Sequence, residues 1–130
     1  MGRPLRLLAA CTAFVAAPAF AQNLVQNGSF ESPALAPGNW GVYAAIPDWT
    51  LVSGGGGEIQ NNVAGAPYAG AQHVELDGYD NSAIERAVPV VPGATYLFTW
   101  AYSPRPGVAS ASNGVEVLVD GNVIGISAAD

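Results

Sequence analysis

The chain has 130 residues, with 4 Lys and Arg against 10 Asp and Glu, a formal net charge of −6 and one cysteine. A phosphate-binding surface needs clustered basic side chains, so this composition argues against nucleic acid and anionic membrane as partners. One cysteine cannot form an internal disulfide or a thiolate zinc site. The length is that of a single domain.

The N-terminus has the three parts of a secretion signal. Arg3 and Arg6 are positive, residues 7–17 are an apolar run, and Ala19 and Ala21 supply the small side chains that precede a cleavage site before Gln22. The run is shorter than the about 20 apolar residues that span a bilayer. We therefore expect residues 1–21 to be a signal peptide, and the mature chain to have no membrane span.

A second interpretation of the leader is a bacterial lipoprotein signal. Residues 8–11, Leu-Ala-Ala-Cys, match a lipobox, in which Cys11 becomes the lipidated first residue. That processing would leave almost no apolar run before Cys11, so the ordinary signal peptide is favoured. Its removal leaves Arg86 and Arg105 against ten acidic residues.

Residues 22–130 are expected to form one all-β domain, because Gly and Pro recur between short β-branched and aromatic runs. The predicted strands are residues 24–26, 46–52, 71–77, 82–90, 95–102, 115–119 and 123–126. Turns are predicted at Asn27-Gly28, at residues 91–94 and at Asp120-Gly121-Asn122, the best hairpin signal. Residues 54–57 are interpreted as a flexible glycine link or a bulge region.

Alternation within the strands predicts the core. Residues 95–102 place Tyr96, Phe98, Trp100 and Tyr102 on one face, and this stripe is expected to be buried. Trp49 is also assigned to the core, since it too lies within a predicted strand.

No strand signal follows the residue 115–126 hairpin before Asp130. A Greek-key sandwich needs a late strand that covers an open edge. We therefore expect the sequence to be a fragment of a domain some tens of residues longer.

Four motifs occur in a fixed order: residues 23–31 (NLVQNGSFE), 46–49 (IPDW), 73–78 (HVELDG) and 91–96 (VPGATY). In this arrangement the chain resembles bacterial secreted choice-of-anchor proteins, which often carry a C-terminal PEP-CTERM sorting signal, and their plant cell-wall relatives. The resemblance implies a galactose-binding-like jelly-roll β-sandwich, a fold that carbohydrate-binding modules also use. It implies a bacterial extracellular or cell-surface location. The closing strands and the sorting tail of the family are absent from this sequence, which leaves the anchoring mode open.

The resemblance also points to a structural calcium near the first turn, although no cofactor is required. Calcium binds six to eight hard oxygens, from carboxylates and carbonyls. The candidate ligands are Asn27, Gly28, Glu31 and Asp77. The alternative is that Asn27-Gly28 is only a turn and Glu31 a solvated strand end.

A carbohydrate site needs aromatic faces that stack on the sugar and polar groups that hydrogen-bond its hydroxyls. The candidates are the loop aromatics Trp40, Tyr43, Tyr68 and Tyr79, the amides of Asn61, Asn62 and Gln72, and Arg105 between two prolines. The alternative for each aromatic is packing over the open end of a sandwich, and for Arg105 simple solvation.

Catalysis is not indicated. Glu58, Glu75, Asp77 and Glu85 could in principle supply a glycosidase pair, but carboxylates are common on an acidic surface. His73 is the sole histidine, and no Gly-x-Ser-x-Gly elbow accompanies it. The sequence predicts a secreted, non-catalytic module that binds cell-surface or matrix polysaccharide weakly. The alternative is a structural or adhesive surface-display domain without a small-molecule ligand.

Overall fold

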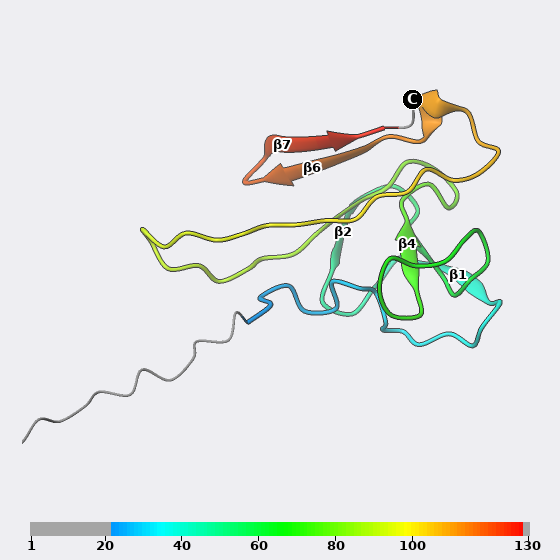
Figure 1. The fold of residues 1–130 in the computed structure, drawn as a ribbon, viewed down its shortest axis with the longest axis horizontal. Coiled ribbons are helices and arrows are strands. Elements are labelled where there is room, and N and C mark those ends of the chain that lie inside the picture. The colour runs from blue at the N-terminus through cyan, green and yellow to red at the C-terminus, as the bar shows by residue number, and fades with distance from the viewer. Residues whose placement is uncertain (1–21, 129–130) are drawn as a thin grey trace, which may run out of the picture.

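The structure is a computed structural model that describes residues 22–128, so the predicted signal peptide lies outside the described residues. Its strands are β1 (Trp40–Tyr43), β2 (Thr50–Ser53), β3 (Gly57–Gln60), β4 (His73–Glu75), β5 (Ala83–Glu85), β6 (Val115–Val119) and β7 (Asn122–Ser127), with a 3-10 turn at Ser110–Ser112 (Figure 1). They pair into three small antiparallel sheets, β1-β3-β4, β2-β5 and β6-β7. The all-β prediction is confirmed, whereas the jelly-roll assignment stays a prediction. No helix among residues 22–128 is long and apolar enough to cross a bilayer.

The best-buried element is β3, the central strand of the three-stranded sheet. All four of its residues are buried. Ile59 is fully buried and has Gly41 and Val74 opposite it on the neighbouring strands. The glycine link predicted at residues 54–57 therefore ends inside a strand, because Gly57 already pairs with Tyr43.

The N-terminal segment is a turn built around Asn27, and the strand predicted at residues 24–26 is wrong. Asn27 has φ 49°, and its amide nitrogen donates to the carbonyls of Ser32 and Pro47, each at 2.8 Å. Its main-chain oxygen accepts from the indole N–H of Trp49 at 3.1 Å, and that indole stacks on Phe30. Hydrogen bonds from the side chain of Asn27, whose backbone is left-handed, thus take the place of the backbone hydrogen bonds that a strand would make.

Other predicted strands are shorter in the structure. Residues 46–49 form a tight turn, in which the Trp49 N–H donates to the Ile46 carbonyl at 3.0 Å and Asp48 has φ 70°. The strand therefore begins only at Thr50. Likewise β4 and β5 have three residues each, because the chain turns away from its partners on either side.

The C-terminal hairpin forms as predicted. Val119 pairs with Asn122, which leaves Asp120 and Gly121 as a two-residue loop with φ 49° and 76°. Positive φ at both loop positions is the type I′ geometry that matches the twist of a hairpin, and Asp-Gly is a preferred sequence for it.

Residues 87–104, here called the arm, run out from the body and return (Figure 1). The predicted turn is present at the tip, where the Ala94 N–H donates to the Val91 carbonyl at 3.1 Å. The strand and buried stripe predicted at residues 95–102 are wrong: no strand forms there, and Phe98 is 47 % exposed. Among the described residues, no backbone hydrogen bond joins residues 95–101 to a neighbouring strand. The stripe is therefore not part of a sheet, although the Trp100 ring lies against Gly125 of β7.

Candidate functional site

The register of the three-stranded sheet divides the sugar-binding candidates between its two ends. At one end Gln60 of β3 lies between Trp40 of β1 and His73 of β4. The loop of residues 61–72 leaves β3 and enters β4 at this same end. At the opposite end Tyr43 pairs with Gly57, the first residue of β3.

The first end, here called the loop end, presents Trp40, Asn62 and Tyr68 to solvent. The side chains of Trp40 and Tyr68 are 54 % and 90 % exposed. The Asn62 amide donates to the Asn61 side-chain oxygen at 2.9 Å. This bond orients the Asn62 side chain, which remains exposed. Main-chain bonds between residues 38–39 and Asn61 tie the start of β1 to the start of the loop. Two exposed rings and one amide therefore share one end of the sheet.

Tyr43 and Tyr79 belong to the opposite end. Tyr79 is 77 % exposed and lies beside Gly55, just before β3, where the Asp80 carboxylate accepts from the Gly55 N–H at 2.6 Å. Tyr43 is half-buried within β1. The prediction that all four aromatics lie in loops is wrong, since Trp40 and Tyr43 are strand residues. The four do not share one end of the sheet.

Asn61 and Gln72 are buried, and their side chains bond to main-chain carbonyls. The Gln72 amide nitrogen donates to the carbonyls of Phe30 and Pro33, at 2.6 and 3.0 Å. The Asn61 amide donates to the Leu35 carbonyl at 2.7 Å. These bonds secure the segment of residues 30–38, so neither amide is available on the surface to a sugar. Their role as ligands was an inference from residue type, which does not reveal burial.

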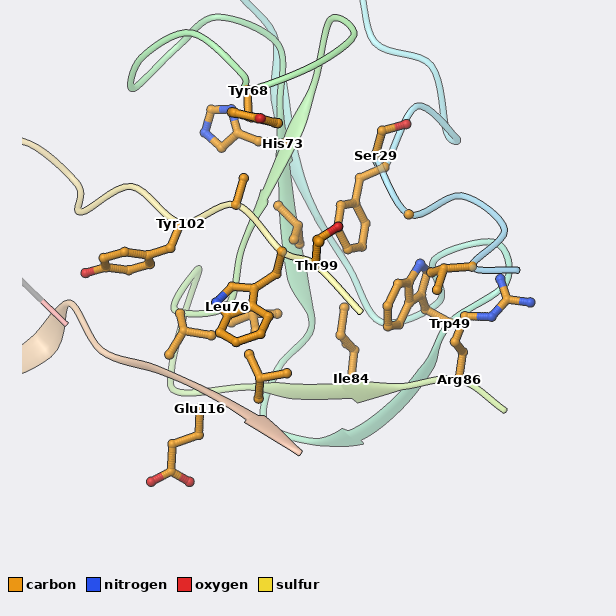
Figure 2. Close-up of a pocket in the computed structure, with 18 of the residues that line it drawn as sticks. Ser29, Trp49, Tyr68, His73, Leu76, Ile84, Arg86, Thr99, Tyr102 and Glu116 are labelled. Carbon is orange, nitrogen blue, oxygen red and sulfur yellow. The ribbon is translucent and has the colours of Figure 1, made fainter. Parts of the chain in front are cut away.

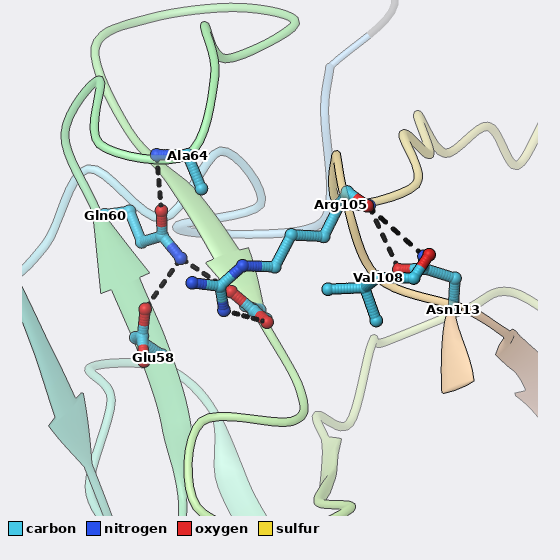
Figure 3. A network of polar contacts seen from close by, with 7 residues as sticks. Glu58, Gln60, Ala64, Arg105, Val108 and Asn113 are labelled. Atoms are coloured by element: carbon cyan, nitrogen blue, oxygen red, sulfur yellow. Dashed lines mark hydrogen bonds and ion pairs between the residues drawn. The ribbon is translucent and has the colours of Figure 1, made fainter. Parts of the chain in front are cut away.

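A polar network that the sequence did not reveal joins β3 and β4 to Arg105, which directly follows the arm (Figure 3). The Gln60 amide nitrogen donates to Glu58 and to Glu75, each at 2.6 Å, and its oxygen accepts from the Ala64 N–H at 3.0 Å. Arg105 donates to the second oxygen of Glu75 at 2.7 Å. Glu58 and Glu75 are register partners on adjacent strands, so one amide separates two carboxylates.

The two carboxylates have different environments. Burial, and then the nearby charge of Glu75, raise the pKa of Glu58 above its ordinary value. Glu75 instead has a guanidinium bonded to it, and that bond raises the pKa of Arg105 further. The network connects the three-stranded sheet to Arg105 at the end of the arm. The Glu58 side chain is buried, so a large substrate does not reach it.

Arg105 is 42 % exposed and bonded to Glu75, so it anchors the end of the arm where it leaves toward the 3-10 turn. Its main-chain N–H donates to the Asn113 side chain at 3.0 Å, which reinforces the ion pair. At the other base of the arm, Arg86 donates to the Gln26 carbonyl at 2.5 Å. Both arginines of residues 22–128 thus hold the arm at its ends.

Two of the four calcium candidates, Asn27 and Glu31, already accept hydrogen bonds from the protein. The Asn27 side-chain oxygen accepts from the Ser32 N–H, and one oxygen of Glu31 accepts from the N–H groups of Ala71 and Gln72. No group of three or more His, Cys, Asp or Glu residues suited to a metal occurs within residues 22–128. These Asn27 and Glu31 oxygens are therefore already engaged in hydrogen bonds within the fold.

A wide cleft opens between the sheets and the arm (Figure 2). Trp49, Leu76, Ile84 and Thr99 line it, with Tyr68 and His73 on one side and Glu116 on another. Its volume of 2920 Å³ far exceeds the about 300–1,000 Å³ of small-molecule pockets. The cleft is thus an opening between elements, and it does not enclose a small ligand.

No protein-family model, no curated protein and no solved structure matches the chain. The resemblance to choice-of-anchor proteins therefore stays a prediction from the four sequence motifs.

Proposed function

We propose that the protein is a secreted, non-catalytic extracellular module that binds a neutral cell-surface or matrix polysaccharide weakly. The observation that supports this function is the loop end, where the rings of Trp40 and Tyr68 and the amide of Asn62 are exposed on β1 and on the loop that leaves β3 beside it. Secretion rests on the predicted leader, and the jelly-roll family rests on the four motifs.

The loop end suits a polymer better than a small molecule. Exposed rings offer flat apolar faces for the C–H side of a sugar, and an amide can donate to and accept from hydroxyls. A shallow surface removes little of a ligand from water, so several neighbouring sugar units must contribute to binding. The acidic chain repels anionic polymers, whereas a neutral glycan meets no such barrier.

The test is affinity electrophoresis of the mature protein in gels that contain soluble neutral polysaccharides. One polysaccharide class should retard the protein, and Trp40→Ala and Tyr68→Ala should each weaken the retardation. Loss of an anchoring aromatic costs about 2 kcal/mol, roughly 30-fold in affinity. Tyr79→Ala is the matched control, because this ring is also exposed but lies at the opposite end of the sheet.

Two results would count against the loop end as the polysaccharide-binding site. Equal weakening by Tyr79→Ala would mean that no particular end of the sheet binds the polymer. Unchanged mobility of folded protein in every gel would remove the carbohydrate function. A repeat with added calcium or a chelator tests the predicted ion, since retardation lost only in chelator would require a calcium site.

The second candidate is a structural or adhesive surface-display domain. The exposed aromatic residues of the arm favour it, because large apolar patches on secreted domains commonly mark contacts with protein. Absence of polysaccharide binding together with self-association would support this function.

A further inference from the structure

The loop of residues 61–72 carries two of the three groups at the loop end, yet it has little regular structure of its own. Tyr68 and Asn62 both belong to it. Among the described residues, no backbone–backbone hydrogen bond joins two residues of the stretch 62–71. A segment without such bonds keeps one shape only where other parts of the protein hold it. The position of the Tyr68 ring therefore depends on what holds the two ends of the loop.

Side chains hold the loop at both ends. At its start, the Ala64 N–H donates to the Gln60 side-chain oxygen at 3.0 Å. At its end, the N–H groups of Ala71 and Gln72 both donate to one oxygen of Glu31, at 2.9 and 3.2 Å. Gln60 directly precedes the loop, whereas Glu31 lies 40 residues before Ala71 in the chain. Glu31 thus joins the end of the loop to a distant part of the fold.

Gly70 shows how closely the loop is fitted to this carboxylate. A Cβ at Gly70 would overlap Oε1 of Glu31, and Gly70 has φ 73°, a conformation that glycine adopts without strain. Hydrogen bonds from N–H groups to a carboxylate are charge-assisted and stronger than those to a neutral acceptor. The stretch of residues 70–72 therefore follows the Glu31 carboxylate, and it begins two residues after Tyr68.

We propose that Glu31 is a positioning residue for polysaccharide binding: its carboxylate fixes the end of the loop and so holds the Tyr68 ring in place for the polymer. The inference rests on the proposed function of the loop end. A ring that is already ordered loses less conformational entropy when a ligand binds than a ring on an unheld loop. Glu31 itself does not contact the polymer, and its effect on affinity passes through Tyr68.

Limited proteolysis with chymotrypsin, which cleaves after aromatic residues, tests the hold on the loop without any ligand. Glu31→Ala removes the acceptor, so cleavage after Tyr68 should become about 10-fold faster, because loops held by few contacts open more often. Cleavage after Tyr79, an exposed tyrosine outside the loop, is the internal reference and should not change. Glu31→Gln keeps an oxygen that accepts from both N–H groups and should stay within about 2-fold of the unaltered protein. Glu85→Ala, which removes an exposed carboxylate of β5, is the matched control and should change neither rate.

Affinity electrophoresis in the retarding polysaccharide tests the effect on binding. Glu31→Ala should lower the affinity by about 10-fold, because the loop must then be ordered when the polymer binds, and Glu31→Gln should restore most of it. In a Tyr68→Ala background, Glu31→Ala should add little, since the ring that it positions is gone. In a Trp40→Ala background it should keep its full effect.

Three results would overturn the role of Glu31. Unchanged cleavage after Tyr68 in Glu31→Ala would mean that the carboxylate does not hold the loop. Equal acceleration after Tyr68 and Tyr79 would mean that the variant weakens the whole fold. An equal loss of affinity with and without the Tyr68 ring would mean that the effect does not pass through it. Where no gel retards the folded protein, the polysaccharide function fails, and the proteolysis still decides whether Glu31 positions the loop.

Discussion

At the scale of single residues, the centre of this protein is organised by buried polar side chains. Gln60 is fully buried and uses both ends of its amide, donating to two carboxylates and accepting from the Ala64 N–H. A buried amide left without partners would be costly, so these bonds select one arrangement of β3, β4 and the following loop. The arrangement of the chain around Gln60 is therefore determined by satisfied polar groups as much as by apolar packing.

Glu58 makes stability depend on pH in a defined direction. Its pKa in the folded protein lies above its ordinary value of 4.5, chiefly because of burial and then because of the Glu75 charge. The folded state therefore binds the proton more tightly than the unfolded chain. The contribution of Glu58 to stability is fully present below pH 4.5 and is lost as the pH rises through the folded pKa.

Glu58→Gln should accordingly increase the free energy of unfolding at neutral pH, since the neutral amide oxygen can still accept from Gln60. The gain should shrink as the pH falls toward 4.5, and urea unfolding at several pH values measures it. Glu85→Gln is the control, because Glu85 is exposed in β5 and should give little change. A gain that grows on acidification would contradict the assignment.

Residue-level prediction from sequence succeeded where the signal is local. The Asn27-Gly28 turn needs only a residue that tolerates positive φ, and it forms. The hydrogen bonds of Gln60, by contrast, depend on Glu75 of β4 and on Ala64 in the loop that follows β3. No local pattern in Gly-Glu-Ile-Gln reports those neighbours.

At the scale of elements, the β6–β7 hairpin shows how turn chemistry sets a register. Gly121 has φ 76°, and Gly121→Val should reduce the free energy of unfolding by about 1–2 kcal/mol, the cost of left-handed backbone for a residue with a Cβ. Gly114→Ala is the control, because a Cβ there would meet only the Ser127 carbonyl, at 3.9 Å. Chemical unfolding compares the two. An equal loss in both variants would mean that the turn does not determine stability.

Elements that depend on distant partners were predicted less well than the hairpin. The alternation of Tyr96, Phe98 and Trp100 is real, but a strand needs a neighbour for its backbone, and residues 95–101 have none among the described residues. Periodicity therefore identified which side chains share a face and did not reveal whether that face is covered. The same limit explains why the four candidate aromatics fell at two ends of one sheet.

At the scale of the whole molecule, the negative charge selects among the polymers that the protein can bind. The chain has a formal net charge of −6, so an anionic polysaccharide is repelled and a neutral one is not. The loop end is proposed to bind a neutral polymer, whose affinity should change little with ionic strength. Salt screens charge–charge forces, with a Debye length of about 30 Å at 0.01 M and about 8 Å at 0.15 M ionic strength.

Raising the ionic strength over this range should therefore leave the retardation of the mature protein by a neutral polysaccharide nearly unchanged, measured relative to a gel without polysaccharide. The reason is that Trp40, Asn62 and Tyr68 carry no charge, so screening removes no attraction between them and a neutral polymer. An anionic polysaccharide is the control, because any retardation by it should be weak at low salt and should rise as salt screens the repulsion. Loss of the neutral-polysaccharide retardation on adding salt would mean that charged groups carry the binding, and would reject the loop end as the site.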